Sequence, residues 1–453
     1  GNRMTVFASI KSFILILLPL IIFHEFGHYF SARFFKIKVL EFGFGFPPKL
    51  FSIWSGKNSL FIEKQLLEKY KNFSPKKYLF VKTKLIYNQL SVEDIYDSKK
   101  EIPISLNKDI IEISSHYYEN GKIYFKEMQW SFNLLPLGGF VRPFGEEDSD
   151  HPESFFIKKP YERLIVLISG VLINFLLPFL LFFVAFLLPG QIQKSDLIIM
   201  EVIKNSPAYN SGLKSGDKIL SVNGRSVNDM SSLQKNITSS LGEDIEIKIE
   251  RGIPNVFSDS WEEKFYYNGD IKYFSSKPRW NPPEGQGALG ISIYSSNPTR
   301  IDPGYGVIDS IKESFFSVIQ LFDLSINSIK AMIAGSTNPQ FSGPSAVGPV
   351  GISQITGQIA VAEIKLKDKI MIFVELTSIL SLSLAVINLL PIPALDGGRI
   401  LFVLIEILRN GKKVSPDKER LVHGMGFIFM LTLLFIITAQ DIIRIYQGIE
   451  LVG

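Results

Sequence analysis

Two histidines four residues apart flank a glutamate in the segment Phe23 to His28, which reads Phe-His-Glu-Phe-Gly-His. On a helix, His24 and His28 lie on one face, so both imidazoles can bind the same metal ion. Zinc takes ligands of this kind, and Glu25 lies beside them as a candidate general base. The segment therefore predicts a hydrolytic zinc site.

A catalytic zinc ion usually has three protein ligands and one open position for water. The sequence contains no cysteine, so the third ligand must be a histidine or a carboxylate. The strongest candidate is Asp396, because two prolines end the preceding helix and Gly397-Gly398 give the backbone freedom to aim the carboxylate. Glu375 is the alternative ligand, but we expect it to lie nearer the opposite side of the membrane.

The composition favours a membrane protein over a nucleic-acid-binding one. The mean hydropathy of the 453 residues is +0.19, and the net charge is only +4. A charge this small gives no reason to expect a nucleic acid as a partner. The absence of cysteine also excludes disulfides, thiolate ligands and a cysteine nucleophile.

Four segments are long and apolar enough to cross a bilayer, which takes about 20 residues. They run roughly from Phe7 to Phe30, Leu164 to Leu188, Ile370 to Leu390 and Met425 to Ala439. We do not expect the first to be a signal peptide, because it runs straight into the histidine motif with no small-residue cleavage site. The spacing of apolar residues over 311–334 predicts an amphipathic helix on the membrane surface.

Basic residues indicate the orientation of these spans. They gather between the third and fourth spans, after the first span and before the second. By the positive-inside rule these three places are cytoplasmic, although Lys365 to Lys369 argue weakly against it. The metal motif then lies toward the cytoplasmic side, and residues 191–300 lie outside.

The remaining segments predict smaller β elements. Two stretches rich in glycine and aromatic residues, Phe42 to Phe46 and Trp130 to Val141, could pair as one small sheet near the motif. Residues 57–126 form a polar insertion of unknown role, with His116 on its surface. Partly alternating apolar residues from Ile102 to Ser115 predict some strand within it. Asn223-Gly224 and the alternation of isoleucines over 245–249 predict strands. We expect loops over 252–286 and 342–351.

Taken together, these motifs resemble a site-2-type intramembrane zinc metalloprotease, in the bacterial branch that cleaves anti-sigma factors and carries a PDZ domain. The resemblance covers nearly the whole chain in family order. It rests on these segments: His24 to His28 with Ala32-Arg33, Phe42 to Phe46, Pro136 to Val141, Gly170 to Asn174, Asn388 to Gly397, and Gly212 to Asp217.

The resemblance implies roles for particular residues. His24, His28 and Asp396 would bind Zn2+, and Glu25 would activate the water and pass its proton to the leaving amine. Four further residues would contact the substrate: Asn174, Asn388, Phe44 and Gly45. In the PDZ-like domain, the residues that would bind peptide are Gly212, Leu213, Gly216 and Asp217.

The resemblance also implies an activity and a location. The substrate would be a single-span membrane protein, such as an anti-sigma factor or a signal-peptide remnant, already trimmed by a site-1-type protease. The enzyme would be a multi-pass protein of the bacterial cytoplasmic (inner) membrane, with its PDZ-like domain outside and lipid around its helices.

The expected fold class is an α-helical membrane protein of four spans with membrane-associated β elements and an extracytoplasmic PDZ-like α/β domain. The expected parts, in order, are the first span with its β loop (1–56), the insertion (57–126), the second β element and span (127–190), the PDZ-like domain (191–305), the amphipathic helix and Gly/Pro-rich loop (306–365), and the last two spans with the Asp-Gly motif (366–453).

Two other functions fit parts of the sequence. A catalytically inactive, zinc-containing protein that binds membrane peptides would keep the ligands, but the intact Glu25 argues against it. A transporter is disfavoured because the sequence has no inverted repeat. Iron or cobalt could occupy the same ligands as zinc.

Overall fold

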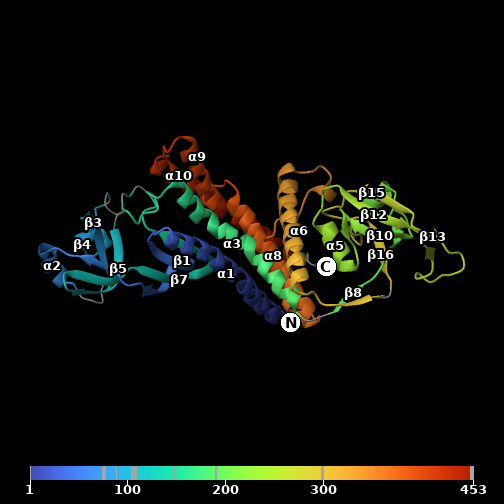
Figure 1. The fold of residues 1–453 in the computed structure, drawn as a ribbon, viewed down its shortest axis with the longest axis horizontal. Coiled ribbons are helices and arrows are strands. Elements are labelled where there is room, and N and C mark those ends of the chain that lie inside the picture. The colour runs from blue at the N-terminus through green and yellow to red at the C-terminus, as the bar shows by residue number, and fades with distance from the viewer. Residues whose placement is uncertain are drawn as a thin grey trace. The chain divides into compact units, whose positions relative to one another are not determined.

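The computed structural model describes residues 2–73, 78–87, 89–103, 110–146, 149, 151–188, 191–296 and 300–448 (Figure 1). It divides into two compact units. The first comprises residues 1–174, 349–361 and 387–453, and the second comprises 175–348 and 362–386.

Five helices among the described residues are long and apolar enough to cross a membrane. They are α1 (Asn2–Phe34), α3 (Pro160–Leu187), α6 (Val307–Ala334), α8 (Leu366–Leu389) and α10 (Pro416–Tyr446). Four of them contain the predicted spans. The fifth, α6, is the helix that the sequence predicts to be amphipathic, and its length and composition would also allow it to span.

Shorter helices lie between these. They are α2 (Lys64–Lys71), α4 (Pro207–Ser211), α5 (Met230–Thr238), α7 (Pro349–Val361) and α9 (Asp396–Leu408), with short 3-10 turns at η1 (Lys99–Glu101) and η3 (Pro339–Phe341). The loop expected over 342–351 therefore ends earlier, because residues 349–351 belong to α7. Helix α7 begins at Pro349, and proline is well suited to the first turn because no helical partner is needed for its missing N–H.

The small sheet predicted near the motif is present, formed by β1 (Val39–Ser55) and β7 (Met128–Pro143). Within β1, residues 42–44 have residues 139–141 of β7 on one side and residues 130–132 of β7 on the other. The edge at 139–143 is different, because β1 lies on one side and no second strand lies on the other among the described residues.

The polar insertion at residues 57–126 contains a closed barrel (Figure 1). Its strands are β2 (Asn58–Phe61), β3 (Leu79–Ile86), β4 (Gln89–Tyr96), β5 (Ile110–Glu119) and β6 (Lys122–Lys126), joined in the order β2-β4-β3-β5-β6. Alternate apolar residues such as Val81, Ile111 and Ile113 fill its core. The surface position expected for His116 is wrong. Its side chain is buried and Nδ1 lies 2.7 Å from the hydroxyl of Tyr70 on α2.

The second unit contains a five-stranded path in the order β15-β12-β10-β9-β16. Its strands are β9 (Leu197–Val202), β10 (Asp217–Val222), β12 (Ile245–Arg251), β15 (Ile271–Ser276) and β16 (Ile291–Ser295), and β11 (Arg225–Ser226) also pairs with β10. The predicted strand over 245–249 is present. The expected loop over 252–286 is wrong in part, because β15 pairs with residues 245–250 of β12.

Two minor strand pairs complete the second unit. They are β8 (Gln191–Lys194) with β17 (Arg300–Pro303), and β13 (Ile253–Pro254) with β14 (Phe265–Tyr266).

Candidate metal centre

Helices α1 and α3 approach closely at two glycines. A Cβ atom on Gly27 would lie 2.6 Å from the carbonyl oxygen of Ser169, and one on Gly170 would overlap the imidazole of His28. Small residues allow helix backbones to come this near. The hydroxyls of Ser31 and Ser169 add a hydrogen bond of 2.7 Å across the same contact. The crossing holds the histidine face of α1 against α3.

Three candidate ligand atoms meet at this crossing. Nε2 of His24 lies 3.1 Å from Oδ2 of Asp396, Nε2 of His28 lies 3.3 Å from the same oxygen, and the two nitrogens are 3.2 Å apart. These residues form the one group of potential metal ligands found in the described part of the chain.

The donor set fits zinc. A tetrahedral zinc ion with bonds of about 2.0–2.1 Å separates its ligand atoms by roughly 3.3 Å. The three sides of this triangle are close to that value. Two imidazole nitrogens and one carboxylate oxygen also leave a fourth position open, as a hydrolytic site requires.

The outer nitrogens of both imidazoles are occupied. Nδ1 of His28 donates to the carbonyl oxygen of Val166 at 2.8 Å, which leaves Nε2 for a metal. Nδ1 of His24 lies 3.1 Å from the side-chain amide of Asn174, which can donate or accept according to how the amide is turned. Partners of this kind orient metal ligands and raise their affinity.

Asp396 is the first residue of α9, and its two following glycines are required for space. A Cβ on Gly397 would lie 2.6 Å from the carbonyl oxygen of Leu389, and one on Gly398 would lie 2.5 Å from that of Ile392. Neither glycine has a positive φ, so the backbone freedom expected for them is not what they supply. The left-handed residue of this turn is instead Ala394, with φ of +78°.

The carboxylate of Asp396 is held in its ionised form. Burial opposes ionisation, but the close approach of the His24 and His28 imidazoles outweighs it and holds the pKa of Asp396 below its usual range. The ionised form is the one that binds a metal.

Glu25 lies at the edge of this group and is half-buried. A Cβ on Gly139 would be 3.1 Å from Cγ of Glu25, so the free edge of β7 passes directly beside the candidate base. Over the described ranges, no hydrogen bond or ion pair holds the Glu25 carboxylate. The side chain is therefore available to a water molecule.

The structure places the expected substrate contacts differently. Asn174 is 1% exposed, and its side-chain amide lies against His24. Phe44 stacks on Phe132, and both sides of its strand are already paired, so it is not on a free edge. The carbonyl of Gly45 accepts a hydrogen bond from Asn133. Asn388 is half-buried.

The four residues expected to bind peptide in the second unit serve its fold instead. Leu213 lies in the core beneath the five-stranded sheet. Asp217 is 1% exposed and forms an ion pair with Arg251 at 2.8 Å. Gly212 and Gly216 both have φ of +90°, a conformation that favours glycine in a turn. Glu375, the alternative ligand, is paired with Lys235 at 2.8 Å.

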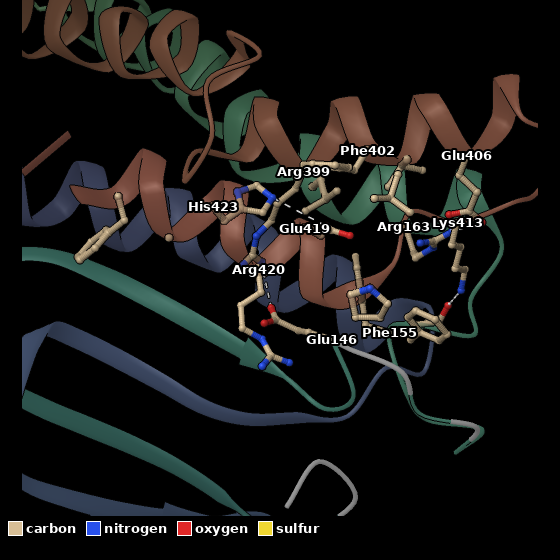
Figure 2. Close-up of a pocket in the computed structure, with 17 residues that line it drawn as sticks. Glu146, Phe155, Arg163, Arg399, Phe402, Glu406, Lys413, Glu419, Arg420 and His423 are labelled. Atoms are coloured by element: carbon tan, nitrogen blue, oxygen red, sulfur yellow. Dashed lines mark hydrogen bonds and ion pairs between the residues drawn. The ribbon is translucent and has the colours of Figure 1, made fainter. Parts of the chain in front are cut away.

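Sequence reasoning missed one residue near Asp396. Nδ1 of His423 on α10 accepts a hydrogen bond from the backbone N–H of Ala394 at 2.9 Å. It lines a cavity of about 360 Å³, shown in Figure 2, together with Arg399 and Phe402. A single histidine on an apolar helix gives no sequence signal for such a contact.

Comparison with known proteins identifies a family that matches most of the chain. The sequence profile described as Peptidase family M50 matches residues 12–62 and 120–433. The unmatched stretch between them contains most of the barrel.

Three relatives share much of the chain. A protein of Clostridium acetobutylicum whose name includes the words zinc metalloprotease is 31% identical over 320 residues, which is 70% of this chain and 84% of that protein. The zinc metalloprotease RasP of Geobacillus kaustophilus is 28% identical over 97% of this chain and 98% of its own. The regulator of sigma-W protease RasP of Bacillus subtilis is 25% identical over 97% of this chain and 99% of its own.

Proposed function

This chain belongs to peptidase family M50, the site-2 protease type, and from that premise we propose that it cuts a transmembrane segment of single-span membrane proteins in a zinc-dependent reaction. It is an enzyme, a membrane metalloendopeptidase. The observation that carries the proposal is the triangle of His24, His28 and Asp396, with Glu25 beside it on apolar helix α1. Ionisable groups in a membrane helix are costly and usually functional.

When bound, zinc acidifies a water molecule and polarises the scissile carbonyl. His24, His28 and Asp396 are the residues that would hold it. Glu25 takes the proton of the attacking water on its carboxylate and then passes it to the leaving amine. Val166 and Asn174 keep the two imidazoles oriented while this happens.

A transmembrane helix hides its carbonyl groups in its own hydrogen bonds, so the substrate must unwind before hydrolysis. The edge of β7 at residues 139–143 supports this step, because an extended segment pairing there would pass Glu25. Asn388 would hydrogen-bond the backbone of the same segment. This edge replaces Phe44 and Gly45 as the proposed pairing surface.

The basic residues of the sequence support a topology with the centre toward the cytoplasmic side of a bacterial inner membrane. In that topology α1, α3, α8 and α10 span the bilayer and α6 lies on its surface. The sheet domain of residues 191–305 is then extracytoplasmic and PDZ-like. It screens substrates, admitting those that a site-1-type protease has already trimmed, and a free sheet edge is the surface it would use.

The test uses the full chain in detergent with a trimmed single-span substrate. We expect one zinc per chain in the wild type, retained zinc without cleavage in Glu25→Gln, and lost zinc without cleavage in Asp396→Ala. Glu375→Gln is the control, since its partner is Lys235, and it should keep both zinc and cleavage. Cleavage by Glu25→Gln would refute the assigned base. Zinc binding with no cleavage of any trimmed substrate would indicate a binding protein instead.

A further inference from the structure

The turn that carries Asp396 is attached to helix α10 through a histidine that the proposed mechanism does not use. Nδ1 of His423 accepts a hydrogen bond from the backbone N–H of Ala394, two residues before Asp396. The acceptor nitrogen carries no proton, so the contact fixes both the tautomer and the orientation of the ring. His423 does not belong to the group of potential ligands itself.

Ala394 needs such a partner. Its φ of +78° lies in the left-handed region, which residues with a Cβ rarely adopt. Conformations of this kind persist only where surrounding contacts hold them, and they gather at functional sites. Other N–H groups of the turn bond within it, as Leu395 does to Ile392, whereas the N–H of Ala394 goes to a side chain from another helix.

Helix α10 makes a second contact with the same turn. Gly426 lies three residues after His423, on the same helical face, and packs against Pro393. A Cβ at Gly426 would lie 2.6 Å from the carbonyl oxygen of Pro393. The ring of Phe402 on α9 also contacts His423, with the two ring centroids 5.4 Å apart (Figure 2).

We propose that His423 is a positioning residue that fixes the turn at Ala394 and thereby sets the direction of the Asp396 carboxylate and the affinity of the centre for zinc. This inference rests on the proposed function, because it takes Asp396 as a ligand. It adds a residue on α10 to a centre whose ligands come from α1 and α9.

The test is a series of three variants measured for zinc affinity by competition with a chelator, on the full chain in detergent. In His423→Asn the amide oxygen occupies the place of Nδ1, so the acceptor is kept. In His423→Gln the acceptor lies one bond further out, and in His423→Leu there is none. We expect the zinc affinity of His423→Asn to be near that of the wild type. The zinc affinities of His423→Gln and His423→Leu should be lower by about 10–100-fold, the range for residues that orient metal ligands.

A second pair of variants separates the turn from general stability. Ala394→Gly relieves the left-handed strain, so adding it to His423→Leu should recover part of the lost affinity. His116→Asn is the matched control, a buried histidine in the barrel that should leave zinc affinity unchanged.

The outcomes are distinct. Wild-type affinity in His423→Leu, or equal loss in the Asn and Leu variants, would overturn the inference while the protease proposal stands. If His423→Leu does not fold, the comparison of Asn with Gln decides. Absence of zinc from the wild type would instead remove the proposed function itself.

Discussion

The side-chain amide of Asn174 lies 3.1 Å from Nδ1 of His24, and only 1% of Asn174 is exposed. The sequence motif around Asn174 suggests a contact with substrate, but the structure gives it a contact with a candidate ligand. The two roles predict different kinetics. We expect Asn174→Ala to lower zinc affinity by about 10–100-fold and to leave KM nearly unchanged when zinc is saturating.

Chelator competition measures the first quantity, and cleavage assays over a range of substrate concentrations measure the second. A substrate contact would give the reverse pattern, with raised KM and unchanged zinc affinity.

Gly170 leaves no room for a side chain beside the two imidazoles. In Gly170→Ala the added methyl group would overlap His28 and lie 2.9 Å from Cε1 of His24, so we expect the purified variant to lose most of its zinc. Gly424→Ala is the matched control, since a Cβ there has no atom within 4 Å. Metal analysis of both proteins checks this, and full zinc content in Gly170→Ala would show that the helices can separate.

Arg163 and Glu406 form a buried ion pair that joins α3 to α9 (Figure 2). Both carboxylate oxygens lie 2.6 Å from Nη2 of Arg163, and each side chain is 7% exposed. Removing one partner leaves a buried charge, which costs about 3–5 kcal/mol. Glu406→Ala should therefore lower the thermal unfolding midpoint clearly.

Two further variants make this prediction specific. The double variant Arg163→Met with Glu406→Leu removes both charges and should recover much of the loss. Glu68→Ala breaks an exposed pair with Lys71 and should change stability by less than about 1 kcal/mol. A double variant as unstable as Glu406→Ala would argue against the buried charge as the cause.

Glu250 makes the sheet domain sensitive to acid. Burial would raise its pKa, but hydrogen bonds from Lys218 and the N–H of Gly269, with the charge of Lys218, lower it below the ordinary 4.5. A depressed carboxylate pKa contributes stability above the unfolded value, and this contribution is lost as pH falls through the folded value.

We therefore expect strands β10 and β12 to lose hydrogen-exchange protection as pH falls below about 4.5. Glu250→Gln should remove this part of the pH dependence. An identical pH profile in the variant would assign acid sensitivity to other groups.

The sequence was sufficient to predict the residues that meet at the candidate centre. His24 and His28 have a fixed helical spacing, and the carboxylate 372 positions from His24 stands in a Pro- and Gly-rich turn with its own signature. What the sequence did not reveal was how the site is supported. The contacts of Asn174 and His423 depend on helix packing, which no local pattern encodes.

The barrel shows a second limit of prediction from the sequence. Its strands alternate apolar residues such as Val81, Val92 and Ile95 with lysines and acidic residues. Averaged over the segment, that alternation looks polar. The period of two indicated strand only over residues 102–115, which overlap β5, and the other strands of the barrel were not predicted. The turn at Gly212 to Asp217 shows the converse, since a recognisable motif was given a binding role although its residues hold the fold.

The barrel leaves the β1/β7 sheet and returns to it at adjoining positions, because Ser55 is paired with Met128. Because the two ends of the barrel segment are adjacent, its insertion, replacement or deletion need not shift the register of β1 against β7. Relatives that differ widely in this part of the chain can therefore keep the same distance between the β7 edge and Glu25.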